Sequence, residues 1–126
     1  MTQQGNFYWN ELLTTDPEAC KKFYGEVVGW TSREMDMGNG TKYTIVKVGG
    51  KDTGGIMKMD GPQFEGVAPH WMTYISVDDV DAALERAAAN GGEVRAPAFD
   101  VPGVGRIGVI SDPTGAVVSL MTPASS

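Results

Sequence analysis

The residue types that most often carry chemistry are scarce in this sequence. Among its 126 residues there is one histidine, His70, and one cysteine, Cys20. An iron site of two histidines and one carboxylate cannot be built from one such chain, and neither can a structural zinc site of cysteines and histidines. Cys20 falls in a predicted helix, where we interpret it as a small packing residue rather than a nucleophile.

Three carboxylates lie close together at Asp78, Asp79 and Asp81. They lack the ligand loop and the distal glutamate of a calcium site. Acidic side chains are favoured at the start of a helix, where backbone N–H groups carry partial positive charge. This cluster therefore predicts a helix N-terminus rather than a cation site.

The same helix-start signal occurs twice, about half the chain apart. Asp16 is a good N-cap and Pro17 suits the first helical position, while Asp79 is the corresponding cap in the second half. Gly91 is a natural stop for the second helix. Apolar residues at helical spacing predict the buried stripes, which are Ala19, Phe23 and Val27 in the first helix and Val80, Ala83, Leu84 and Ala87 in the second.

Each predicted helix is preceded by one segment typical of a strand and followed by three more. Turns are expected at Gly38-Asn39-Gly40, Gly49-Gly50, Pro102-Gly103 and Asp112-Pro113. The chain thus repeats a strand-helix-three-strand unit. The expected strands are FYWNELLT, WTSREM, TKYTIVKV and GGIMKM in the first half, and WMTYISV, GEVRAPAF, GRIGVIS and GAVVSLM in the second.

Composition and charge exclude several classes of partner. The chain is 41% hydrophobic and 21% charged, with a net charge of −6, which is typical of an ordinary soluble globular protein. No basic stripe is present to bind a nucleic acid, and no apolar run is long enough to cross a membrane. The N-terminal MTQQGNF lacks the features of a signal peptide. With only one cysteine, we expect a cytoplasmic protein without a disulfide.

The pattern resembles the vicinal oxygen chelate superfamily, which includes glyoxalase I, extradiol dioxygenases and bleomycin-resistance proteins. The resemblance covers nearly the whole chain and is closest to the small glyoxalase-like members. It rests on NELLTTDPEACKKFYGEVVGW, ISVDDVDAALERAAANGGEV and SDPTGAVVSLM, in that order. It implies an α+β fold in which two strand-helix-three-strand modules form a cupped mixed sheet with helices on the outer face. We expect one domain over 1–126, with module one at about 6–59, a linker at 60–69 and module two at about 70–122.

The resemblance also locates four positions at which family members hold a metal. In this sequence they fall on Trp9, Met72, Ser119 and either Lys58 or Met57. A lysine adds positive charge, a tryptophan has no usable lone pair, and a neutral serine or methionine is a weak ligand for hard or borderline divalent ions. The expected metal set and cofactor set are therefore empty.

The same resemblance implies which side chains line the cup. Strand side chains alternate between faces, so if Trp9 points into the cup, Glu11 does as well, and Tyr74 is its counterpart in module two. The candidate ligand-binding residues are Trp9, Glu11, Met57, Lys58, Met72, Tyr74 and Ser119. Apolar walls with a few polar anchors are typical of small-molecule sites, although a strand with tryptophan and methionine is also typical of a filled core.

Three functional hypotheses follow. The first is a metal-free protein that binds a small, partly aromatic ligand in the cup. The second is a glyoxalase-like lyase or related enzyme, with Glu11 as general base and Tyr74 or Lys58 stabilising negative charge. The third is a filled cup with only a partner-binding role. In each case we expect a homodimer, because exposed sheet edges need covering. The modules could pair within one chain or across the dimer.

Overall fold

The computed structural model describes residues 4–37 and 42–124. These residues form two compact units. One unit is Trp9–Trp71, and the other combines the described residues up to Tyr8 with those from Met72 onward. The predicted turn at Gly38-Asn39-Gly40 lies outside the described residues. No helix in the described part of the chain has the length and apolarity that crossing a membrane requires.

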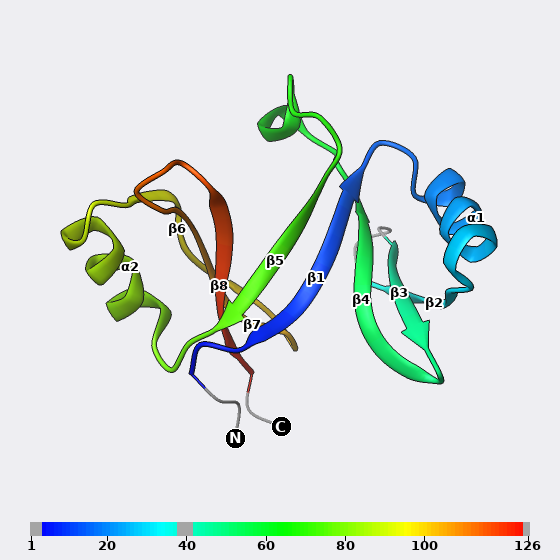
Figure 1. Cartoon of the computed structure of the whole chain (residues 1–126), viewed down its shortest axis with the longest axis horizontal. Coiled ribbons are helices and arrows are strands. Elements are labelled where there is room, and N and C mark those ends of the chain that lie inside the picture. The colour runs from blue at the N-terminus through cyan, green and yellow to red at the C-terminus, as the bar shows by residue number, and fades with distance from the viewer. Residues whose placement is uncertain (1–3, 38–41, 125–126) are drawn as a thin grey trace. The chain divides into compact units, whose positions relative to one another are not determined.

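The first module has the predicted order of elements (Figure 1). Its sheet has the order β2-β3-β4-β1, with β1 parallel to β4 and the other neighbours antiparallel, so the sheet is mixed. A short 3₁₀ helix, Pro62–Phe64, lies in the predicted linker. The elements are β1 (Phe7–Thr14), α1 (Pro17–Val28), β2 (Thr31–Asp36), β3 (Lys42–Val48) and β4 (Lys51–Lys58).

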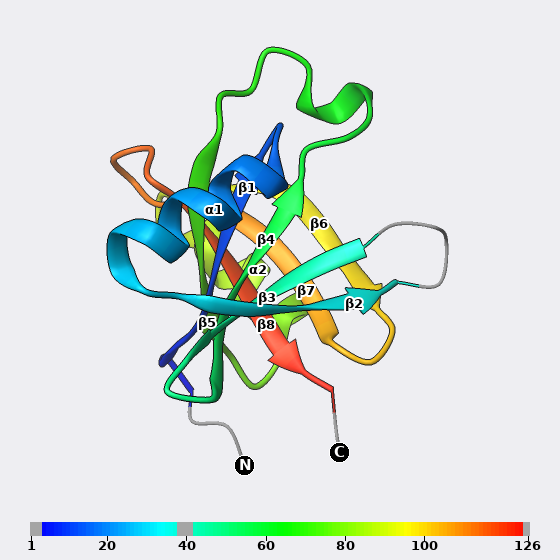
Figure 2. The same cartoon turned by 90° about the vertical axis from the view of Figure 1, so that its right-hand side faces the viewer.

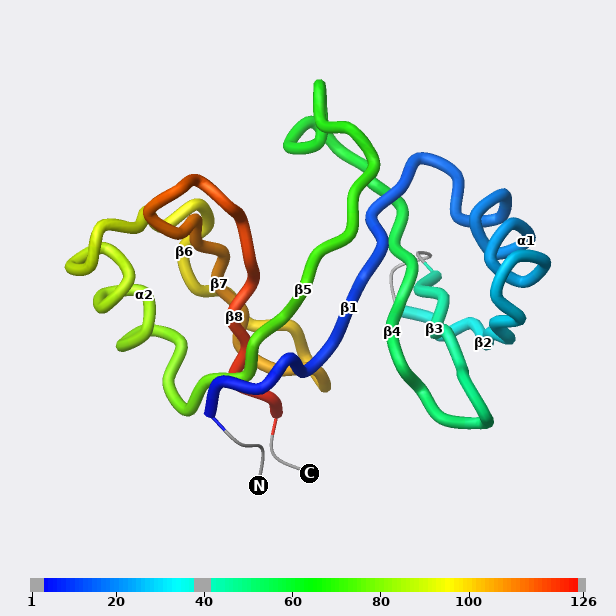
Figure 3. The backbone as a smooth tube through the Cα atoms, viewed as in Figure 1, coloured from blue at the N-terminus to red at the C-terminus, as the bar shows by residue number. Residues whose placement is uncertain are grey.

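The second module repeats this order, as the backbone trace of Figure 3 shows. Its sheet runs β5-β8-β7-β6, and β5 is parallel to β8. The chain is therefore α+β with two strand-helix-three-strand modules, which confirms the predicted fold class. The elements are β5 (His70–Ser76), α2 (Val80–Ala89), β6 (Glu93–Val101), β7 (Gly105–Ser111) and β8 (Val117–Pro123).

Both helices begin at the predicted aspartates. The Asp16 carboxylate accepts a hydrogen bond from the Ala19 N–H at 3.1 Å, and the Asp79 carboxylate accepts one from the Ala82 N–H at 3.2 Å. Each cap satisfies a backbone donor that the first helical turn leaves without a partner. The first helix ends at Gly29, whose φ of 79° is the left-handed conformation that favours glycine.

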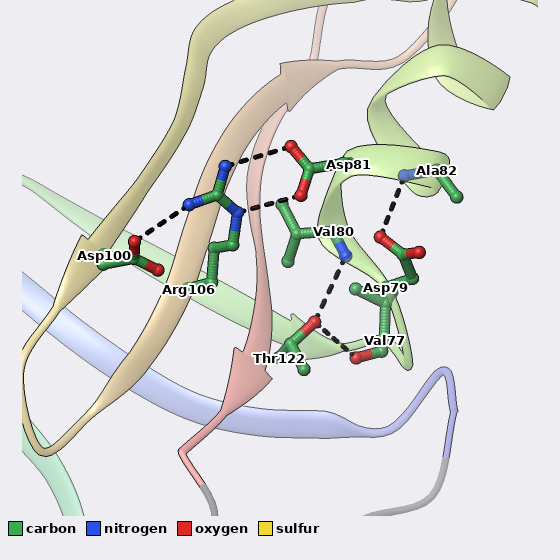
Figure 4. Close-up of polar contacts among 8 residues, drawn as sticks. All are labelled: Val77, Asp79, Val80, Asp81, Ala82, Asp100, Arg106 and Thr122. Atoms are coloured by element: carbon green, nitrogen blue, oxygen red, sulfur yellow. Dashed lines mark hydrogen bonds and ion pairs between the residues drawn. The ribbon is translucent and has the colours of Figure 1, made fainter.

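The start of α2 is also fixed to the strands of its own unit (Figure 4). The Thr122 hydroxyl on β8 accepts from the Val80 N–H at 3.2 Å and donates to the Val77 carbonyl at 2.9 Å. Arg106 on β7 donates through Nε and Nη2 to the two oxygens of Asp81, at 2.9 and 3.1 Å. The acidic cluster was predicted to mark the start of a helix, and α2 does begin there. Asp81, one of its members, also accepts hydrogen bonds from Arg106.

The prediction of the buried stripe is confirmed for α2 but wrong for α1. Val80 and Leu84 are buried with Val77 and Leu120, and Ala83 contacts the same cluster. In α1 the contacting residues are instead Cys20 and Tyr24, which meet a cluster on the sheet formed by Leu12, Val46 and Ile56.

The predicted α1 stripe lies on the solvent side of the helix. Phe23 and Val27 are 57% and 60% exposed, and Ala19 is exposed as well. Both sets of α1 residues recur every four positions, so sequence spacing could not decide between them. Contact with the sheet decides in favour of Cys20 and Tyr24.

Strand boundaries agree with prediction to within two residues, with one exception. The first strand of the chain is Phe7–Thr14 as expected, whereas β4 begins at Lys51 rather than at Gly54. The early start follows from the tight turn at Gly49 and Gly50, both with positive φ, which returns the chain directly into antiparallel pairing with β3.

Candidate functional site

Each sheet has one side that contacts its own helix and an opposite side, here called the distal face. In module one Leu12 and Ile56 pack against α1. Because strand residues alternate sides, Trp9 and Glu11 lie on the distal face. That this face lines a ligand site stays a prediction.

A short chain of hydrogen bonds joins three side chains on this face. The Trp9 indole Nε1 donates to the Tyr43 hydroxyl at 3.1 Å, and that hydroxyl donates to Glu11 Oε2 at 2.7 Å. Glu11 is only 7% exposed, and an O–H donor at this distance is typical of a charge-assisted bond to a carboxylate. The phenol therefore both compensates and orients a buried acid.

Gly55 provides the space in which Tyr43 lies. Gly55 is the register partner of Glu11 on β4, and a Cβ atom at this position would overlap the Tyr43 hydroxyl and ring. Any side chain here would displace the phenol from Glu11. Glycine inside a strand is typical of such a close approach.

The structure distinguishes between the two candidates on β4. Met57 is half-buried and is the register partner of Leu13, whereas Lys58 is exposed and pairs with Thr14. Since Ile56 lies on the helix side, Met57 shares the distal face with Glu11 and Lys58 does not. Of the two alternatives, Met57 is the one on the predicted face, and the Tyr43 hydroxyl donates a hydrogen bond to Glu11.

Module two places its three candidates in a comparable way within its own sheet. Tyr74 on β5 and Ser119 on β8 are register partners. The next pair, Ile75 and Leu120, packs with α2, so Tyr74 and Ser119 lie on the distal face, and Met72 shares it by alternation. Ser119 is buried, while Met72 and Tyr74 are half-buried. That these three join the module-one set in one ligand site stays a prediction.

The residues at the family's metal positions do not fit a divalent ion. Trp9, Met72, Ser119 and Met57 or Lys58 include no carboxylate, imidazole or thiolate. Over residues 4–37 and 42–124, the structure also brings together no group of three or more His, Cys, Asp or Glu side chains that could hold a metal.

Sequence reasoning missed Tyr43. It lies on β3, more than thirty residues from Glu11. The usable signal was the Gly54-Gly55 pair inside a strand, because a glycine there indicates that another group approaches the backbone closely. The identity of that group depends on strand pairing, which the local sequence does not specify.

Comparisons with known proteins agree with this architecture. The family model described as "Glyoxalase/Bleomycin resistance protein/Dioxygenase superfamily" matches residues 8–120. A protein of Mycobacterium bovis provisionally named glyoxylase CFP32 is 44% identical over 98% of this chain and 46% of its own length. The anthracycline biosynthesis protein DnrV of Streptomyces peucetius is 30% identical over 89% of this chain and 45% of its own. The chain thus spans about half the length of these curated relatives.

Among solved structures, methylmalonyl-CoA epimerase of Streptomyces coelicolor in complex with 2-nitronate-propionyl-CoA is similar. Its TM-score is 0.66 at 16% identity, over 98% of this chain and 100% of that one. At this identity the likeness supports the fold alone.

Proposed function

The chain belongs to the glyoxalase/bleomycin resistance protein/dioxygenase superfamily, and from that premise we propose that it binds a small, partly aromatic molecule without a metal. The observation that carries this proposal is the distal face of module one, where Trp9 lies beside a buried carboxylate held by Tyr43. An apolar, aromatic wall with one oriented acid is the chemistry of a ligand pocket with few polar anchors. Trp9 offers a surface for a flat ring, and Glu11 accepts an N–H or O–H of the ligand.

The proposed ligand has a definable chemistry. A negatively charged group next to Glu11 would meet repulsion from the carboxylate, whereas an amine or a hydroxyl would be attracted to it. We therefore expect planar aromatic amines and phenols to bind and matched aromatic carboxylates to be rejected. In module two, the proposed contacts are Met72, Tyr74 and Ser119.

A thermal-shift screen tests this proposal. Purified protein is titrated with a panel of aromatic amines, phenols and carboxylates of similar size. For a compound that raises Tm saturably, Glu11→Gln should weaken binding about tenfold or more, because a charge-assisted bond becomes a neutral one. Glu85→Gln, which changes an exposed glutamate on α2, is the matched control and should bind like wild type. A panel that produces no saturable shift would contradict the proposal.

The second candidate is an enzyme in which Glu11 acts as general base. It is favoured by the burial of this carboxylate, and the relatives' names include a glyoxylase. The structures of similar fold include a methylmalonyl-CoA epimerase. Exchange of the α-proton of a methylmalonyl thioester in D₂O, followed by NMR, distinguishes the two. Exchange that depends on Glu11 would replace the binding proposal with catalysis.

We further propose that the chain acts as a homodimer in a reducing cytoplasm. The sheet of module one has β2 as its outer strand, and that of module two has β6. Strands in such positions present backbone groups that proteins usually cover. The single cysteine is consistent with the proposed compartment.

A further inference from the structure

Helix α1 has two apolar sides, and among the residues that the structure describes only one of them packs on the sheet. Cys20 and Tyr24 contact the sheet, while Phe23, Val27 and Val28 are 57%, 60% and 55% exposed. In the view of Figure 2, no other helix or strand of the unit Trp9–Trp71 lies in front of this helix. Isolated exposed apolar residues are ordinary on protein surfaces, but a contiguous set indicates an interaction site.

The exposed side of α1 continues into a cluster of aromatic rings. Phe23 meets Tyr24 edge to face at 5.1 Å, and Tyr24 stacks on Trp30 at 4.9 Å. Trp71, 43% exposed, contacts Tyr24 at 5.7 Å and Trp30 at 5.8 Å between ring centroids. Tryptophan and tyrosine are enriched among residues that dominate binding energy in protein interfaces.

A hollow of about 310 Å³ lies beside these rings. It is lined by Asn10, Trp30, Val46, Thr53, Gly54 and Trp71, none of which is charged. One of these lining residues, Gly54, has no side chain. The hollow lies on the helix side of the sheet, as the contact of Val46 with the α1 cluster shows, and so it is separate from the distal face that carries Glu11. An uncharged hollow next to exposed aromatic rings can receive an apolar side chain.

We propose that this aromatic surface, formed by Phe23, Tyr24, Val27, Val28, Trp30 and Trp71, binds a second copy of the same chain. This inference rests on the proposed homodimer, but its support is the apolar surface of α1 and not the sheet edges, which this interface would leave uncovered. It is independent of the identity of the ligand.

Charge favours a second copy as the occupant. The whole chain has a net charge of −6, so two copies repel each other over most surfaces. The charged residues of α1 balance to zero: Glu18 and Glu26 are acidic, and Lys21 and Lys22 are basic. This helix is therefore a surface that a second copy approaches without net repulsion.

The arrangement of those charges also fits two-fold symmetry. Lys21 pairs with Glu18 at 3.1 Å, but within the described residues Lys22 and Glu26 make no ion pair. A two-fold axis brings the same surface of both copies together. If two α1 helices pack antiparallel, Phe23 of one copy lies near Val27 of the other, and Lys22 of one lies near Glu26 of the other. The apolar centre is then flanked by opposite charges.

Sedimentation velocity with wild type and two surface variants tests the interface. Phe23→Glu and Val27→Glu place a charge at exposed positions, so each variant should fold, as far-UV circular dichroism will verify. Wild type should be a dimer at micromolar concentration, and both variants should raise the dimer dissociation constant at least a hundredfold, because each would desolvate an unpaired charge in an apolar interface. Val117→Glu, at an apolar position on β8 that is 46% exposed, is the matched control and should remain dimeric.

The possible outcomes test two claims separately: that the chain is a homodimer, and that α1 forms the interface. A dimer that both variants leave intact overturns the assignment to α1 and leaves the homodimer standing. A wild type that stays monomeric up to about 100 µM overturns both the homodimer and its α1 interface. This conclusion holds even if the hollow is found to bind a small aromatic probe such as 2-naphthol. Because Glu11 lies on the other side of the sheet, ligand-induced thermal shifts should persist in Phe23→Glu, so failure of the interface does not imply failure of the ligand proposal.

Discussion

The side chain of Glu11 illustrates how a buried acid can be retained in an aromatic setting. A carboxylate that is only 7% exposed costs free energy unless a donor compensates it. Tyr43 supplies that donor at 2.7 Å and accepts in turn from Trp9 at 3.1 Å. The phenol therefore has its donor and its acceptor function used at once, which restricts the orientation of all three side chains.

We predict that Tyr43→Phe lowers the free energy of unfolding by about 1–3 kcal/mol, because it removes a donor from a buried carboxylate and an acceptor from the Trp9 indole. Glu11→Gln should cost about 1 kcal/mol, since the amide oxygen still accepts from Tyr43 but without the charge. Urea unfolding of the apo protein measures both, with Tyr8→Phe at a 42% exposed position as the control.

The double variant decides whether the two residues act together. If Tyr43 and Glu11 interact as described, the combined loss should be smaller than the sum of the single losses by at least about 0.5 kcal/mol. Strict additivity would argue against the bond. A gain in stability from Glu11→Gln would instead identify a carboxylate kept for ligand binding at a cost to the fold.

A second prediction at the scale of single residues concerns Gly55. We expect Gly55→Ala to be strongly destabilising, by about 2 kcal/mol or more, because the new methyl group would overlap the Tyr43 phenol. The cost should fall in a Tyr43→Ala background, where the space is vacant. Denaturant unfolding of the four proteins measures this, and an equal cost in both backgrounds would show that the Tyr43 phenol is not the reason for glycine at this position.

At the scale of the elements, the attachment of α2 depends on charge. Arg106 contacts Asp81 through two hydrogen bonds and Asp100 through a third, at 3.0 Å (Figure 4). The hydrogen bonds from Arg106 hold the pKa of Asp81 below its ordinary value of 3.8. All three side chains face solvent, so salt screens the interaction.

We predict that this contact stabilises the protein at neutral pH and is lost in acid. Because the folded pKa of Asp81 is depressed, the stabilisation is fully present above pH 3.8 and disappears as the pH falls through the lower folded value. The difference in unfolding free energy between wild type and Asp81→Asn should therefore shrink as the pH is lowered from 6 toward 3. Glu85→Gln on the same helix is the control, and a difference that does not vary with pH would contradict the assignment.

The elements also show where sequence reasoning succeeds and where it fails. The strand FYWNELLT was predicted residue for residue, because aromatic and β-branched residues end at a clear helix cap. The side of α1 that packs on the sheet was not predicted correctly, because Phe23 and Val27 have the same four-residue spacing as Cys20 and Tyr24. Local periodicity identifies an apolar stripe, but only the sheet determines which stripe is covered.

For the candidate site as well, the sequence predicts local alternation along a strand but not the pairing between strands. Alternation along β1 placed Trp9 and Glu11 on one face from sequence alone. The partner of Glu11 was not predictable, because it depends on pairing between β1, β4 and β3. A one-residue change of register on β4 exchanges Met57 for Lys58, and the sequence left both alternatives open for that reason.

At the scale of the whole molecule, family membership and local chemistry point in different directions. The superfamily is known for metal sites, yet the positions that correspond to them carry Trp9, Met72, Ser119 and Met57 or Lys58. A shared fold does not imply a shared reaction, since function depends on the side chains placed on it. The chemistry of these side chains therefore carries more weight than the resemblance.

We predict that the protein, purified without chelators, contains well below one divalent metal ion per chain. Metal affinity requires several carboxylate, imidazole or thiolate ligands in one place, and neutral serine, methionine or tryptophan side chains cannot replace them. Inductively coupled plasma mass spectrometry measures the bound metals, and thermal shifts with added nickel, zinc and manganese test for weak binding. His70→Gln is the control for nonspecific binding, because His70 is the single imidazole in the chain. Metal at about one ion per chain that survives His70→Gln and is lost in Glu11→Gln would establish a carboxylate-based centre at Glu11, and would favour the enzyme over the binding protein.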